Sequence, residues 1–146
     1  MGKKQKAMYT GLFLTESSKA ALLSAVSVHT GLHPKILAHH LTLKFRPMPG
    51  EVKDLPMGAT VAFQAIGYGA DEKAQAVICT VPAGLTCANI HPHVTVALAD
   101  DAKPVYSNEL LAQGYTAFES PINLTARVGY SDGRNDYFDL QGSIYE

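Results

Sequence analysis

Alternating apolar and polar residues mark two short strands that share one pattern. Every second residue of 40–45 (HLTLKF) is leucine or phenylalanine, and every second residue of 93–98 (HVTVAL) is valine or leucine. Successive side chains of a strand point to opposite faces, so each segment is predicted to bury its apolar residues and to carry a histidine and a threonine together on the other face. These polar pairs are His40 and Thr42 in the first strand and His93 and Thr95 in the second.

One such strand alone is weak evidence for a functional site. A half-buried strand must place polar residues on its solvated face, and histidine and threonine fall two positions apart by chance in many proteins. In this chain, however, both copies open with the histidine and place the threonine at the same phase. The repetition favours a functional pair over two unrelated surface strands.

The rest of the pattern predicts two helices and five further strands. Residues 16–28 follow helical spacing, and Thr15 is placed to cap the first turn. Ser107 and Asn108 are predicted to cap a second, short helix that ends near Gly114. The further predicted strands are residues 8–14, 60–68, 74–81, 122–130 and 137–144, with irregular segments at 46–58 and 82–92.

This order of elements predicts an α+β fold with an internal repeat. Residues 8–81 and residues 92–144 each contain a motif strand, a helix and a hairpin. No segment of flexible composition separates them, so we expect two related lobes within a single domain, residues 1–146.

The two motifs, His40-Leu-Thr42 and His93-Val-Thr95, together with the order of elements around them, resemble the 2H phosphoesterases. This superfamily includes RNA 2′,5′-ligase-like proteins, the cyclic phosphodiesterase domains of tRNA ligases, and phage enzymes that destroy cyclic nucleotide signals. Residues 103–111 further resemble the small stand-alone members that are likened to tRNA ligase. The resemblance implies a bilobal fold of two pseudo-symmetric antiparallel sheets, with outer helices and a central cleft.

The resemblance also implies a metal-independent phosphodiesterase that hydrolyses cyclic phosphates of nucleotides, with His40, Thr42, His93 and Thr95 as its catalytic residues. Two imidazoles that flank one site suit this chemistry, because histidine titrates near pH 6.5, so one ring can accept a proton while the other donates one. Threonine hydroxyls can donate hydrogen bonds to the charge that develops on the phosphate oxygens. The sequence leaves open which histidine is the acid and which the base.

Two other functions remain open at this level. The same fold could serve as a non-catalytic nucleotide- or RNA-binding module, although two intact motifs favour an enzyme. RNA 2′,5′-ligation is chemically the reverse reaction, and the residues alone do not separate it from hydrolysis.

Four residues outside the motifs are candidates for substrate binding. Tyr9 opens the first predicted strand and could stack on a base, and Lys44 shares the face of His40 in the strand pattern. His91 has the same parity as His93, and Arg127 lies on a polar strand face from which it could reach phosphate.

The other histidines and a tyrosine are interpreted as structural. His39 neighbours His40 in sequence and should therefore point to the core-facing side of the strand. His29 and His33 are expected at the solvated surface, whereas Tyr130 is expected in the core.

Composition limits the ligand and the location. The 146 residues are 47% hydrophobic, and 12 basic residues face 13 acidic ones, so no broad basic surface for duplex DNA is expected and a small nucleotide or an RNA end is favoured. The two cysteines and six histidines lack metal-site spacing, so we expect no metal and no cofactor. The basic segment 1–6 precedes a broken apolar stretch that is neither a secretory signal nor a membrane span. We expect a cytoplasmic monomer that contacts no membrane.

Overall fold

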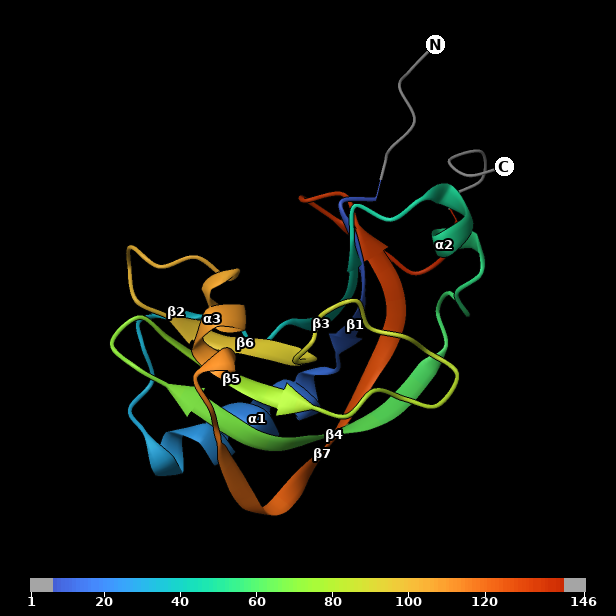
Figure 1. Cartoon of the computed structure of the whole chain (residues 1–146). Helices are drawn as coiled ribbons and strands as arrows, with labels where there is room; N and C mark the ends of the chain where they lie inside the picture. Colours follow the sequence, from blue (N-terminus) through green and yellow to red (C-terminus); the bar gives the residue numbers. More distant parts are fainter. Residues whose placement is uncertain (1–6, 141–146) are drawn as a thin grey trace.

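A computed structural model describes residues 7–140 of the chain, which form eight strands and three helices (Figure 1). The helices are α1 (Glu16–His29), α2 (Pro49–Lys53) and α3 (Tyr106–Ala112). The strands are β1 (Tyr9–Leu14), β2 (Lys35–Ile36), β3 (His40–Phe45), β4 (Thr60–Ala70), β5 (Ala74–Cys79), β6 (His93–Leu98), β7 (Thr116–Ser131) and β8 (Asp136–Tyr137).

All eight strands belong to one antiparallel sheet, in which the main order is β1-β3-β6-β5-β4-β7-β8 and β2 lies on β6. Because β1 pairs with β7 as well as with β3, the sheet curves and closes on itself through the pairing of β1 with β7. The α+β class is confirmed, but the two separate sheets expected from the family resemblance are not what the structure shows. The cause is the long strand β7, which pairs with β4 along its first part and with β1 along its last six residues, so that one sheet is continuous (Figure 1).

The strand β7 begins at Thr116, six residues before the predicted start at residue 122. The strand therefore contains Pro121, which cannot donate a ladder hydrogen bond. The pairing with β4 shows how it is accommodated: Ala65 lies opposite Ile122 and Gly67 opposite Ala117, so the surplus residues of β7 around Pro121 form a bulge.

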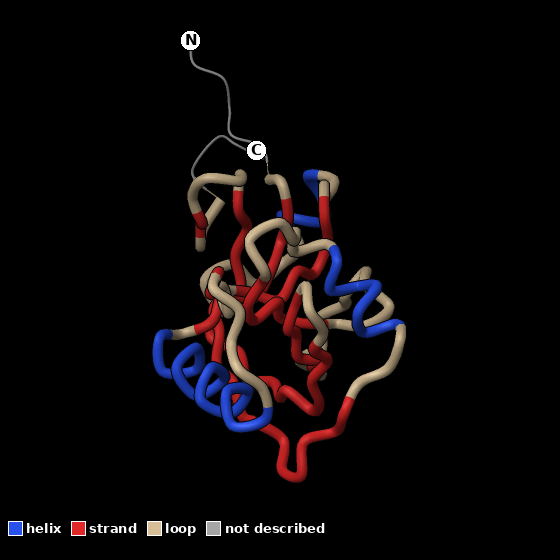
Figure 2. The backbone as a smooth tube through the Cα atoms, turned by 90° about the vertical axis from the view of Figure 1, so that its left-hand side faces the viewer, coloured by secondary structure: helices blue, strands red, loops and turns tan. Residues whose placement is uncertain are grey.

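The two larger helices cover opposite sides of the sheet (Figures 1 and 2). On one side, Leu22 and Val26 of α1 join the largest cluster of buried apolar residues, which includes Leu41 and Val94 of the motif strands. On the other side, Leu110 and Leu111 of α3 pack in a second cluster with apolar residues of β5. The motif strands therefore bury their apolar face under α1 and turn their polar face towards the side of α3.

The helix ends confirm one predicted cap and contradict the other. The hydroxyl oxygen of Thr15 accepts a 3.2 Å hydrogen bond from the backbone N–H of Ser18, as an N-cap should. The helix α3, by contrast, begins at Tyr106, so Ser107 lies inside the helix and caps nothing. No helix within residues 7–140 is both long enough and apolar enough to cross a lipid bilayer.

Three further predictions are revised at the periphery. The short helix α2 occupies part of the segment predicted as a loop, with a proline in its first turn. The two-residue strand β2 went unpredicted. The last strand, predicted at residues 137–144, is observed at Asp136–Tyr137, and residues 141–144 lie outside the described part of the chain.

Candidate active site

The two motif strands are direct neighbours in the sheet. Leu41 of β3 lies opposite Val94 of β6 in an antiparallel pairing, and both side chains are fully buried in the main core. Since the flanking side chains point to the other face of the sheet, all four motif residues emerge on the same side. The sequence predicted two polar faces that meet across a cleft, but the structure joins them side by side on one sheet face.

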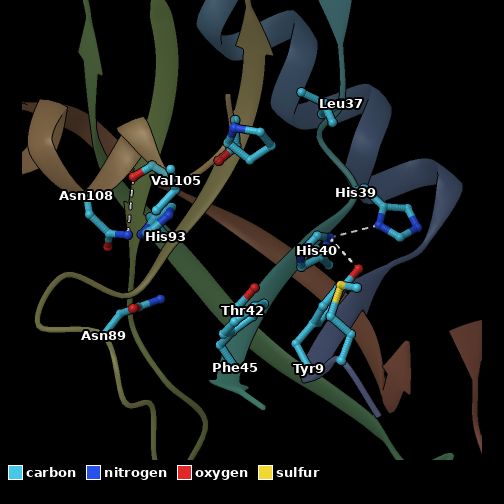
Figure 3. Close-up of a pocket in the computed structure, with 13 residues that line it drawn as sticks. Tyr9, Leu37, His39, His40, Thr42, Phe45, Asn89, His93, Val105 and Asn108 are labelled. Atoms are coloured by element: carbon cyan, nitrogen blue, oxygen red, sulfur yellow. Dashed lines mark hydrogen bonds between the residues drawn. The ribbon is translucent and has the colours of Figure 1, made fainter. Parts of the chain in front are cut away.

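A cavity of about 570 Å³ opens on this face (Figure 3). All four motif residues line it, so the structure brings together the predicted catalytic set. The full lining consists of Met8, Tyr9, Leu37, His39, His40, Thr42, Phe45, Asn89, His93, Thr95, Pro104, Val105 and Asn108. The cavity therefore collects residues from β1, β3, β6, the start of α3 and the loops between them.

The segment between β2 and β3 contains a bulge that changes the direction of the side chains. Ile36 lies opposite Ala97 and Leu41 opposite Val94, so five residue steps on one side match three on the other. The surplus is taken up around Ala38, whose backbone adopts a left-handed φ of 48°, a conformation that is uncommon for a residue with a side chain. Bulges of this kind often redirect side chains beside functional sites.

This bulge corrects the prediction for His39. Strand alternation placed His39 in the core, but it precedes β3 and its side chain is 46% exposed and lines the cavity. Its Nδ1 lies 2.8 Å from Nδ1 of His40, and its Nε2 lies 2.9 Å from a carboxylate oxygen of Asp136. The strand rule failed because it holds only inside a regular strand.

Aromatic rings enclose His40. The Tyr9 ring stacks on it with centroids 4.5 Å apart, and the Tyr9 hydroxyl lies 3.5 Å from its Nδ1. Phe13 lies behind it, with ring centroids 5.7 Å apart. Burial, and then the neighbouring His39 and His93, lower the pKa of His40 from 6.5 to about 3. In the free protein His40 is therefore neutral near pH 7.

His93 is held by the backbone. Its Nδ1 lies 2.7 Å from the carbonyl oxygen of His91, and since a carbonyl only accepts hydrogen bonds, Nδ1 must carry the hydrogen. Burial lowers the pKa of His93, while the hydrogen bond to the His91 carbonyl acts in the opposite direction. Among the residues that the structure describes, Nε2 of neither His40 nor His93 has a hydrogen-bond partner, so both atoms are available to a ligand.

The threonines are fixed by different contacts. The Thr95 hydroxyl lies 2.8 Å from the hydroxyl of Ser107, which is fully buried in α3. Thr42 lies opposite Gly11 of β1, where a Cβ atom would stand 2.9 Å from the Leu41 carbonyl oxygen. The absence of a side chain at Gly11 thus allows β1 and β3 to approach closely beside the motif.

Of the four predicted substrate-binding residues, Tyr9 alone lines the cavity. Lys44 is exposed and does not line the cavity. A register shift between Thr10 and Gly11, where β1 pairs with β3, reverses the alternation of side chains at the end of β3, so Phe45 lines the cavity instead. The Arg127 guanidinium lies 4.2 Å from the centre of the Phe138 ring, away from the cavity.

His91 contributes its backbone carbonyl to His93, while its side chain does not line the cavity. His29 is exposed at the end of α1, as expected, and stacks on Tyr68. His33 is half-buried rather than fully solvated, with its Nε2 2.8 Å from the Asp71 carbonyl oxygen. Tyr130 is fully buried, as predicted.

The sequence patterns did not predict several residues of the site. His39, Asp136 and Ser107 contact the motif residues through hydrogen bonds or a chain of them, and Asn89 and Asn108 line the cavity. The doubled histidine at 39–40 was the one visible signal. Within residues 7–140, no three His, Cys, Asp or Glu side chains are grouped so that they could hold a metal ion.

Comparison with known proteins gives one family and one fold. A family model described as "Fungal tRNA ligase phosphodiesterase domain" matches residues 57–125, which include the second motif. No curated protein matches the sequence at a significant level. The solved structure described as "Crystal Structure of Fungal RNA Kinase" superposes with a TM-score of 0.62 and 18% identity over 90% of this chain and 47% of that one, so this chain spans about half its length. The family match over residues 57–125 confirms the resemblance to the tRNA ligase phosphodiesterase domains, a family of the 2H phosphoesterases. The superposition shows that the fold is shared.

Proposed function

We propose that this protein hydrolyses cyclic phosphodiesters of nucleotides by paired general acid and base catalysis, without a metal ion. The substrates would be 2′,3′-cyclic phosphates of nucleotides or RNA ends, or cyclic nucleotide signals. The observation that carries the proposal is the shared cavity: His40, Thr42, His93 and Thr95 all line it, and no described residue forms a hydrogen bond with Nε2 of either imidazole. The match to a phosphodiesterase family supports the same reaction class.

The geometry supports hydrolysis in one displacement at phosphorus. One Nε2 takes a proton from a water molecule as its oxygen attacks the phosphorus atom, and the other imidazolium gives a proton to the ribose oxygen as its bond to phosphorus breaks. The product is a phosphomonoester. The Thr42 and Thr95 hydroxyls would donate hydrogen bonds to the non-bridging oxygens, where negative charge builds up.

The cavity lining favours a ligand with a single negative charge. Within residues 7–140 the lining contains no charged side chain besides its three histidines, and apolar residues such as Met8, Phe45 and Val105 dominate it. A cyclic phosphodiester carries one negative charge, and a nucleobase can pack on Tyr9 or Phe45. Asn89 and Asn108 offer amides that can both donate to and accept from the edge of a base. Small nucleotides and single RNA ends suit this site better than long nucleic acid.

A panel assay tests the proposal directly. Protein treated with a chelator is incubated with 2′,3′-cyclic nucleotides, RNA ending in a cyclic phosphate, 3′,5′-cyclic nucleotides and cyclic oligonucleotides, and the position of the product phosphate is read out. We expect turnover of at least one class without added metal. Binding without turnover would replace the proposal with a nucleotide-binding module, and activity that returns only with a metal would contradict the metal-independent mechanism.

The pH dependence should differ from that of two ordinary histidines. The pKa values of both histidines are lowered. In the free protein each imidazole therefore takes up its second proton at a pH below the usual histidine value near 6.5. We expect kcat/KM, which reports the free protein, to be highest below about pH 6.5 rather than between pH 6 and 8. The bound phosphate favours a charged imidazole, so the kcat maximum should lie at higher pH than the kcat/KM maximum. A kcat/KM maximum above pH 7.5 would contradict this pair of histidines as the titrating groups.

A further inference from the structure

A chain of three side chains ends at His40. A carboxylate oxygen of Asp136, in β8, lies 2.9 Å from Nε2 of His39, and Nδ1 of His39 lies 2.8 Å from Nδ1 of His40. The edge of the Phe13 ring meets His39 with centroids 5.4 Å apart, so packing helps to hold the ring. The contact links a residue near the end of the described chain to the first motif, a connection that no part of the sequence pattern indicated.

The partners determine where the hydrogen atoms lie. An ionised carboxylate only accepts hydrogen bonds, so Nε2 of His39 carries a hydrogen and donates it to Asp136. When His39 is neutral, its Nδ1 is then bare and can only accept. The 2.8 Å contact consequently requires that Nδ1 of His40 carries a hydrogen, which leaves Nε2 of His40 with a free lone pair.

We propose that Asp136 and His39 are positioning residues, which hold His40 in the tautomer whose Nε2 is unprotonated, and that His40 is accordingly the general base and His93 the general acid. This assignment rests on the proposed phosphodiesterase function. It answers a question that the two motifs, alike in sequence, leave open.

The proton movements follow from this assignment. Nε2 of His40 takes the proton of the attacking water while its Nδ1–H stays bonded to His39, and the Asp136 carboxylate stabilises the resulting imidazolium through His39. Nε2 of His93 gives its proton to the departing ribose oxygen. The His91 carbonyl accepts the Nδ1–H of His93 in both protonation states, so this ring can carry the second proton without losing its anchor.

The surroundings of the two rings differ in the same sense. The Tyr9 ring and a second imidazole enclose His40 and exclude the solvent that would favour its charged form, whereas the backbone carbonyl bonded to His93 favours the charged form of that ring. Among the residues that the structure describes, the titratable or charged groups that face His40 and His39 are Tyr9, His93 and Asp136. Asp136 is the one acid among them, and it reaches His40 only through His39.

Two substitutions at one position separate positioning from packing. His39→Phe keeps a ring against Phe13 but offers no acceptor to His40, and we expect kcat to fall at least ~10-fold with little change in KM. His39→Asn places an amide oxygen near the position of Nδ1, so it should retain activity to within about 3-fold of wild type. Asp136→Ala should lie between them. His29→Phe, which removes an exposed histidine at the far end of α1, is the matched control and should leave kcat unchanged.

A spectroscopic measurement tests the tautomer without any substrate. In ¹⁵N NMR spectra of the histidine rings at pH 8, the signals of His40, assigned by their loss in His40→Gln, should show hydrogen on Nδ1 and a bare Nε2. In His39→Phe and Asp136→Ala we expect the hydrogen to move largely to Nε2. This result can hold even if the panel assay finds no turnover, so the two proposals fail separately.

Either of two results would overturn the inference. One is a wild-type His40 that carries its hydrogen on Nε2 at pH 8. The other is an equal effect of His39→Phe and His39→Asn on kcat, whether both are active or both impaired, because the acceptor atom would then have no role. Thermal unfolding of each variant confirms that it is folded under the assay conditions.

Discussion

Replacing either motif histidine with alanine is expected to lower kcat at least ~100-fold, the usual size of a general acid or base contribution. Both side chains line the cavity instead of filling the core, so each variant should remain folded. In the proposed mechanism one ring takes a proton from the attacking water, and the other gives a proton to the departing oxygen in the same displacement. The double variant should therefore be little slower than the slower single variant, because groups that act as a unit are strongly non-additive.

The measurement is single-turnover kinetics on the substrate class that the panel assay identifies, with thermal unfolding as the check on folding. His29→Ala removes an exposed histidine on the other side of the sheet and serves as the control. Substantial activity in the double variant would contradict paired-histidine catalysis. Losses that multiply in the double variant would show two independent roles and would likewise contradict the mechanism.

The regular parts of this fold are those that the sequence predicted well. The motif strands and β4 follow strand alternation, and α1 follows helical spacing from its Thr15 cap. These are local rules, and the hairpin of β4 and β5 was likewise predicted from two strand-like runs joined by a short turn. The histidine and threonine of each motif could be placed on one face of their strand for the same reason. Their meeting in one cavity was inferred from the repetition of the motif, and the structure shows it.

The departures arise where local rules end. The bulge around Ala38 turned His39 into the cavity, and the register shift beside Gly11 replaced Lys44 with Phe45 in the lining. Both are irregularities of pairing between strands far apart in the sequence, so a single-strand pattern cannot contain them. The continuity of β7 past Pro121 has the same origin, because it depends on which strand lies opposite.

The sequence around Ser107 is compatible with two roles, a helix cap and a contact with the second motif. A serine before an acidic and leucine-rich stretch is typical of a helix cap, and that was the prediction. In the structure Ser107 lies in the first turn of α3, fully buried, and its hydroxyl meets that of Thr95 at 2.8 Å. The helix α3, which lines the cavity with Asn108 and is preceded by Val105 in the same lining, thus also contacts the second motif.

The second large effect is expected at the threonines. Thr42→Ala or Thr95→Ala should each lower kcat by roughly 10- to 1,000-fold, as expected when a donor to developing charge is removed. Thr→Ser at either position should recover most of the loss by restoring the hydroxyl. Neither substitution should shift the pH limits of activity much, because the titrating imidazoles remain. Unchanged rates in the alanine variants would reduce the threonines to residues of a strand face.

Ser107 gives this prediction an internal control. Ser107→Ala frees the Thr95 hydroxyl to rotate, so we expect a smaller loss of kcat, roughly 2- to 10-fold, which corresponds to one hydrogen bond of ordinary strength. If Ser107 acts through Thr95, its replacement should cost nothing further in a Thr95→Ala background, yet should keep its full effect in a Thr42→Ala background. A loss of equal size in both backgrounds would mean that Ser107 supports α3 alone. The orientation of Thr95 would then depend on β6 and not on its contact with the helix.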